Sequence, residues 1–163
     1  MPGQKQKGKN NMHEAIFIVN IDTDIMPDED DILTAAQHYA GADYIEKEDH
    51  NWDTKTFKKV INAIFSKQKE KNGVFTVQAD DAKQFMDGII LRVKEHAKTI
   101  TPETFQRWRD SLRFNILESG PSFIVDGAFM FTPEFISVLY NTARRSESQE
   151  VSFRLIGIYD MHI

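Results

Sequence analysis

The feature that most constrains the fold is a continuous apolar run near the N-terminus, Ala-Ile-Phe-Ile-Val-Asn-Ile at residues 15–21. Branched and aromatic side chains favour extended backbone, and a run without polar alternation is typical of a strand that is covered on both faces. An Asp-Gly pair at residues 126–127 lies between two further apolar runs, which predicts a β-hairpin over residues 122–131. We therefore expect a β-sheet in which the first strand is central.

Helical segments alternate with these strands. Thr-Pro-Glu occurs at residues 101–103 and again at 132–134, where Thr can cap a helix and Pro can take its first position. A helix that begins at residue 54 is expected to end before the Asn-Gly pair at 72–73. The whole pattern predicts an α/β fold, with α+β as the alternative. It has one mixed sheet of about five strands, including the 122–131 hairpin, and about five helices packed on it.

Length and composition limit the organisation of the chain. The 163 residues suit one domain, which we place at residues 13–163, after a flexible basic tail at residues 1–12. The absence of cysteine excludes a thiolate zinc site and a thiol nucleophile. No apolar run approaches the ~20 residues that cross a bilayer, and the N-terminus lacks the apolar stretch of a signal peptide. We therefore expect a cytoplasmic protein with no membrane contact.

Charge is separated along the chain, and this separation suggests a binding function. Residues 14–53 carry a net charge of −11, whereas residues 54–71 carry +5. Such blocks favour contact with another protein, through the acidic stretch 43–53 or the basic segment 54–71. The alternative is that both blocks are solvated surface. Since no catalytic motif is present, we expect a small binding or regulatory protein rather than an enzyme. The candidate contact residues are Trp52, Lys55, Lys58, Lys59 and Lys67.

An acidic cluster supports an alternative, enzymatic function. Asp22 and Asp24 follow the first predicted strand, and Asp80 and Asp81 follow the strand predicted at 73–78. Carboxylates at strand ends can hold Mg²⁺, which would orient a phosphate. The pattern resembles two pieces of the haloacid dehalogenase phosphatases, which implies phosphoryl transfer by a phosphatase or nuclease. Met26, however, stands where that family has Thr or Val. The same acids could instead cap helices and turn the chain.

Weak nucleic-acid binding is the second alternative. It would use the lysines of the tail and of the segment 54–71, although the chain as a whole is acidic. The glycine-rich loops that bind nucleotides are absent from the sequence. We therefore expect no cofactor, apart from the Mg²⁺ of the enzymatic alternative.

Overall fold

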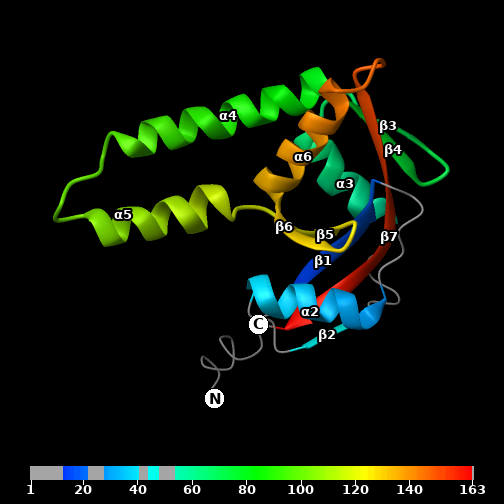
Figure 1. Cartoon of the computed structure of the whole chain (residues 1–163), viewed down its shortest axis with the longest axis horizontal. Helices are drawn as coiled ribbons and strands as arrows, with labels where there is room; N and C mark the ends of the chain where they lie inside the picture. The colour runs from blue at the N-terminus through cyan, green and yellow to red at the C-terminus, as the bar shows by residue number, and fades with distance from the viewer. Residues whose placement is uncertain (1–12, 22–27, 41–43, 48–53, 163) are drawn as a thin grey trace.

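The computed structural model describes residues 13–21, 28–40, 44–47 and 54–162, which build one mixed sheet with helices on both faces (Figure 1). Within these residues the sheet has seven strands in the order β3-β4-β7-β1-β5-β6, with β2 also paired to β7. The strands are β1 His13–Asn20, β2 Tyr44–Lys47, β3 Lys69–Lys71, β4 Val74–Gln78, β5 Ser122–Val125, β6 Ala128–Phe131 and β7 Glu150–His162.

Five α-helices accompany the sheet in the described residues, so the mixed fold is confirmed in its α+β form. They are α2 Glu29–Ala40, α3 Thr54–Ile64, α4 Ala79–Ala97, α5 Phe105–Leu112 and α6 Thr132–Arg144. A π-helical turn, η1 Arg113–Leu117, continues α5. None of the helices in the described part of the chain combines the length and the hydrophobicity that a membrane crossing requires.

The central position of β1 is confirmed. It pairs in parallel with β5 on one side and antiparallel with β7 on the other. Its four residues from Ile16 to Val19 are all buried, with Phe17 and Val19 facing one core and Ile16 and Ile18 facing another. The run lacks polar alternation because both of its faces are covered.

The two cores lie on opposite faces of the sheet. Helices α3 and α6 and the start of α4 cover one face, and α2 covers the other beside β1, β5 and the end of β7. A bulge between Ile18 and Val19, opposite Leu155–Gly157, shifts the register of β7. Consequently Phe153 faces the first core, whereas Tyr159 and Met161 face the second, although all three have odd numbers.

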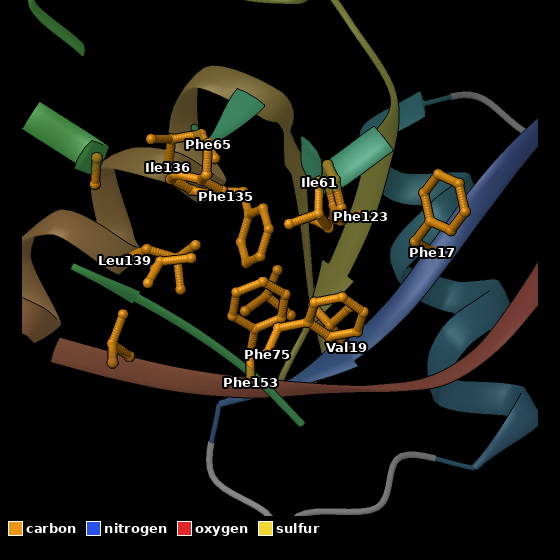
Figure 2. Close-up of a cluster of buried hydrophobic side chains, with 14 of the residues drawn as sticks. Phe17, Val19, Ile61, Phe65, Phe75, Phe123, Phe135, Ile136, Leu139 and Phe153 are labelled. Carbon is orange, nitrogen blue, oxygen red and sulfur yellow. The ribbon is translucent and has the colours of Figure 1, made fainter. Parts of the chain in front are cut away.

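Phenylalanine dominates the first core (Figure 2). Phe75 and Phe153 are cross-strand partners on β4 and β7, and their rings stack with centroids 5.7 Å apart. Phe135 of α6 meets Phe153 edge-on at 5.5 Å, and Phe57 of α3 meets Phe75 at 5.1 Å. Such offset and edge-to-face pairs fix how the helices lie on the sheet.

Two predicted helix boundaries are wrong. Helix α3 ends at Ile64 rather than near residue 71, because Asn72 and Gly73 form a left-handed turn that joins strands β3 and β4. The Thr-Pro-Glu sequence at residues 101–103 lies before the helix rather than at its start, since α5 begins at Phe105. Thr132 does not cap α6; its hydroxyl donates instead to the Pro121 carbonyl at 2.6 Å.

The hairpin at residues 122–131 is confirmed. Asp126 and Gly127 have φ values of 49° and 89°, the left-handed pair that a tight hairpin turn requires. The Asp126 carboxylate also accepts a hydrogen bond from the Ile21 backbone N–H at 2.9 Å, which ties this turn to the end of β1. The tail predicted at residues 1–12 lies outside the described residues.

Candidate functional site

The acidic residues predicted to bind metal do not converge where they are described. Asp22 and Asp24 lie outside the described residues. Asp80 is exposed, whereas Asp81 is buried and accepts hydrogen bonds from the hydroxyl of Ser66 at 3.2 Å and the backbone N–H of Lys67 at 2.8 Å. Asp81 therefore fastens the loop after α3 to the start of α4. Across the described ranges, no group of three or more His, Asp or Glu side chains could hold a metal ion.

The predicted contact lysines lie on two different elements. Lys55, Lys58 and Lys59 belong to α3, and Lys67 lies in the loop that follows it. Lys58 forms an ion pair with Glu70 at 3.0 Å. The backbone N–H of Gly73, together with Lys58, lowers the pKa of Glu70. Part of the basic charge is thus neutralised within the chain. Trp52 lies outside the described residues.

A different surface stands out in the structure. Helices α4 and α5 form an antiparallel helical hairpin that projects from the sheet (Figure 1). We include in this helical hairpin the connection between the two helices and η1, which continues α5. In the described part of the chain, the large apolar side chains left exposed all lie on it: Ile90, Leu91, Ile100, Phe105, Phe114 and Leu117. A concentration of exposed apolar groups on one projecting element is typical of an interaction surface.

The base of the helical hairpin is firmly anchored. Ala82 is fully buried in the first core, and Phe85 and Met86 pack against its edge. Helix α4 lies along α6 in this region, and the buried Asp81 holds its first turn. These contacts make the first two turns of α4 part of the globular body, from which the rest of the helix extends.

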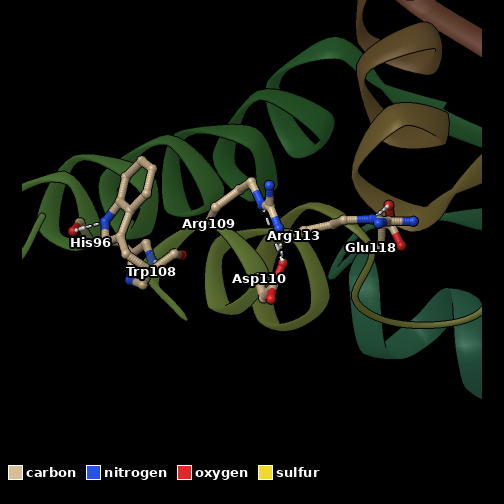
Figure 3. Close-up of polar contacts among 6 residues, drawn as sticks. All are labelled: His96, Trp108, Arg109, Asp110, Arg113 and Glu118. Carbon is tan, nitrogen blue, oxygen red and sulfur yellow. Dashed lines mark hydrogen bonds and ion pairs between the residues drawn. The ribbon is translucent and has the colours of Figure 1, made fainter. Parts of the chain in front are cut away.

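Near its tip the helical hairpin is held by one aromatic contact (Figure 3). The rings of His96 on α4 and Trp108 on α5 stack with centroids 5.3 Å apart and an interplanar angle of 12°. The Trp108 Nε1–H donates to the His96 carbonyl at 2.7 Å, and the His96 Nε2–H donates to the Trp108 carbonyl at 2.9 Å. These reciprocal bonds fix the two helices side by side at this point.

Helix α5 contributes little to the core of the protein. None of its residues is buried, yet Phe105, Trp108 and Leu112 follow one another at helical spacing and form an apolar stripe. Phe105 stacks on Trp108 at 6.1 Å but remains 48% exposed. An amphipathic helix is normally stabilised by covering its apolar face. In the described structure this face of α5 is covered only in part, since Trp108 and Leu112 are half-buried and Phe105 is exposed.

Charged groups hold η1, the segment that leads from α5 back towards the sheet. The Arg92 guanidinium donates to the Asn115 carbonyl at 2.8 Å, which joins α4 to η1. Arg113 pairs with Glu118 at 2.6 Å and lies 5.0 Å from the centre of the Phe114 ring. The hydrogen bond and the charge of Glu118 raise the pKa of Arg113.

The helical hairpin carries a hollow of about 290 Å³ near its tip, lined by His96, Thr99, Thr104, Arg107, Trp108 and Ser111. Towards the sheet, the exposed Ile90 follows the buried Ile89, and the exposed Leu117 follows the buried Ile116. Each helical segment thus has an apolar residue that its neighbours leave exposed.

Helical periodicity in the sequence identifies the apolar faces of α4 and α5, but it does not show that parts of these faces are exposed. Met86, Ile90 and Val93, like Phe105 and Leu112, have the spacing that normally indicates a buried helix face. Periodicity predicts which face is apolar, and only the tertiary structure shows whether another element covers it. The comparisons with known proteins give no further indication, because no family model, curated protein or solved structure matches this chain.

Proposed function

We propose that this chain is a protein-binding module whose contact surface is the helical hairpin formed by α4, α5 and η1. The observation that carries the proposal is the placement of the exposed large apolar side chains of the described residues, all of which lie between Ile90 and Leu117. Exposed apolar groups cost free energy unless a partner removes them from water, at roughly 25 cal/mol per Å². A helical face of this kind suits a groove or another helix.

The geometry favours the helical hairpin over the basic segment that charge alone suggests. Helix α3 points its apolar residues, Phe57 and Ile61, into the core, and Lys58 is paired with Glu70. The exposed lysines of α3 would contribute electrostatic attraction but no apolar anchor. Because apolar and aromatic anchors dominate the energy of most protein interfaces, Phe105 and its neighbours are the better candidates.

Photo-crosslinking in living cells tests this proposal. The full chain would carry p-benzoyl-phenylalanine in place of Phe105 in one sample and in place of Lys59 on α3 in the other. We expect a crosslinked adduct of defined mass from position 105 and none from position 59, since only the helical hairpin is covered by a partner. Adducts from position 59 without any from position 105 would assign binding to the basic helix and overturn the proposal.

A further inference from the structure

We propose that the open face of strands β3, β4 and β7 carries a binding site for a small ligand with two or more linked phosphate groups. The site is a hollow of about 540 Å³ whose lining includes the basic side chains of Lys69, Lys71 and Arg154. This volume lies within the range of roughly 300–1,000 Å³ that is usual for small-molecule sites. The hollow lies on the sheet rather than on the helical hairpin, so it is separate from the proposed protein-binding surface.

The register of the strands brings the basic residues together. Lys71 pairs with Val74, and Val74 pairs in turn with Arg154, so these three residues form one row across the sheet. Lys69 lies in the next row of the same face, opposite Thr76. Since neighbouring strands are about 4.8 Å apart and alternate residues of a strand about 7 Å apart, the backbone positions of the three basic residues span an area of about 10 Å by 7 Å.

The hollow lies on the face of the sheet that is turned away from the first core. Phe75 of β4 and Phe153 of β7 are buried in that core, and side chains alternate along a strand, so Val74 and Arg154 lie on the opposite face. Helix α2 covers this opposite face beside β1 and β5, whereas the β3–β4 hairpin lies at the other end of the sheet (Figure 1). A ligand can therefore reach the hollow from solution.

The fold leaves the positive charge of the hollow largely uncompensated. Within the described residues, its three basic side chains form no ion pair. Glu70 of β3 lies on the other face of the strand, where it pairs with Lys58 of α3. The lining contains a single carboxylate, that of Glu150, against the three basic groups, which gives a net charge of +2. An anion with several charges would relieve the repulsion between these like charges.

The polar groups of the hollow suit phosphate oxygens. Arginine can bind a phosphate through two parallel hydrogen bonds, and lysine supplies a compact positive charge. The hydroxyls of Thr76 and Ser152 share one hydrogen bond at 2.8 Å, so the second of their two protons can be donated to a ligand oxygen. Because the basic groups come from two rows, they can contact different phosphates of one chain.

The same lining disfavours a macromolecular partner. Among the described residues that line the hollow, Val74 is the only apolar one, and none is aromatic. Protein interfaces usually depend on buried apolar or aromatic anchors, and single-stranded nucleic acids usually stack their bases on aromatic rings. A short chain of phosphates needs neither kind of anchor.

Two lysines of the basic segment 54–71 provide a matched test. Lys71 and Lys59 are both exposed, but Lys59 lies on α3, which covers the opposite face of the sheet. Substitution by glutamine removes one positive charge at either position. If the ligand binds in the hollow, Lys71→Gln weakens binding and Lys59→Gln does not. Thr76→Val is a further variant, which keeps the branched shape and the charge but removes the hydroxyl.

Isothermal titration of the purified full chain with sodium tripolyphosphate gives the readout. We expect one bound ligand per chain, and a dissociation constant about tenfold or more weaker for Lys71→Gln and for Arg154→Gln, since each loses a charged hydrogen bond. Thr76→Val should weaken binding about threefold, and Lys59→Gln less than about twofold. Circular dichroism confirms that each variant is folded.

Two outcomes would overturn the site itself. They are the absence of saturable binding up to about 10 mM tripolyphosphate, and equal weakening by Lys59→Gln and Lys71→Gln, which indicates attraction to the basic segment as a whole. Tighter binding of ATP than of tripolyphosphate would support a nucleotide as the ligand, and equal binding would support recognition of the phosphate chain alone. A polyglutamate peptide or an oligothymidylate that binds the hollow more tightly than either would show that the ligand class is wrong.

Discussion

At the scale of one residue, Asp81 follows a strand end, where a metal ligand was expected, but its carboxylate stabilises the fold instead. It is 6% exposed, and its two oxygens accept hydrogen bonds from Ser66 and Lys67, so both are engaged within the fold. We expect Asp81→Asn to lower the free energy of unfolding by about 1–3 kcal/mol, because the amide group cannot accept from every donor now bound. Urea unfolding monitored by circular dichroism measures this loss.

Asp80 is the matched control for that substitution. It occupies the same first turn of α4 but is exposed. Asp80→Asn should cost only about 0.3–1 kcal/mol, the value of an acidic group near the positive end of a helix dipole. A larger loss for Asp80→Asn than for Asp81→Asn would contradict the structural role assigned to Asp81.

Glu70 provides a prediction of pH dependence. Its pKa lies below the usual 4.5 because it accepts a hydrogen bond from the Gly73 backbone N–H and pairs with Lys58. A lowered pKa in the folded state stabilises the protein above the unfolded-state value, and this contribution is lost as the pH falls through the folded-state value. The wild-type chain should therefore be more stable than Glu70→Gln at pH 7, by a margin that shrinks below pH 4.5.

Thermal unfolding of both proteins between pH 7 and pH 3 measures that margin. Lys58→Gln, which leaves the Gly73 bond intact, should reduce the margin without removing it, since Gly73 is the larger cause of the pKa shift. A difference between wild type and Glu70→Gln that grows as the pH falls would show that the sign of this argument is wrong.

At the scale of elements, local signals predicted which segments form helices and strands better than they predicted where these end. Asp126-Gly127 fixed the 122–131 hairpin because both residues adopt positive φ, and the turn needs no distant partner. Asn72-Gly73 is the same kind of signal, yet it marks a hairpin between two short strands rather than the end of a long helix. The charged residues of β3 carry no apolar pattern, so the sequence could not distinguish this strand from a solvated helix.

Two glycines, Gly88 in α4 and Gly120 before β5, allow opposite predictions about the free energy of unfolding. Gly88 lies in the interior of α4, and a Cβ there would contact nothing within 4 Å. Gly88→Ala should therefore raise the free energy of unfolding by roughly 0.5–1 kcal/mol, because alanine loses less backbone entropy in a helix. Thermal or urea unfolding would detect the change.

At Gly120 the same glycine-to-alanine substitution should destabilise the protein. Its φ is +81°, and a Cβ would lie 2.7 Å from the Thr132 Oγ1, which donates to the Pro121 carbonyl. Gly120→Ala should cost about 1–3 kcal/mol through backbone strain and this collision. Equal effects of the two substitutions would mean that the local backbone described here is wrong.

At the scale of the whole molecule, the central position of the first strand could be predicted, but the exposure of the apolar residues on the helical hairpin could not. The buried run at residues 15–21 indicated a central strand, because only a strand covered on both faces tolerates such a sequence. The apolar faces of α4 and α5 have the same periodicity as a buried helix face, and their exposure depends on how far α4 extends beyond α6. That extension is a property of packing between distant segments, for which no local pattern exists.

Hydrogen–deuterium exchange of the full chain, captured from cells together with its bound proteins and compared with the purified chain alone, tests most directly whether the helical hairpin is the covered surface. A partner that covers α4 and α5 suppresses their local opening, so their amides should exchange more slowly in the captured sample. We expect this slowing in peptides from residues 88–97 and 105–117, and no change in α3. Slower exchange confined to α3, or unchanged exchange in the helical hairpin of a sample that contains bound protein, would contradict the proposed binding surface.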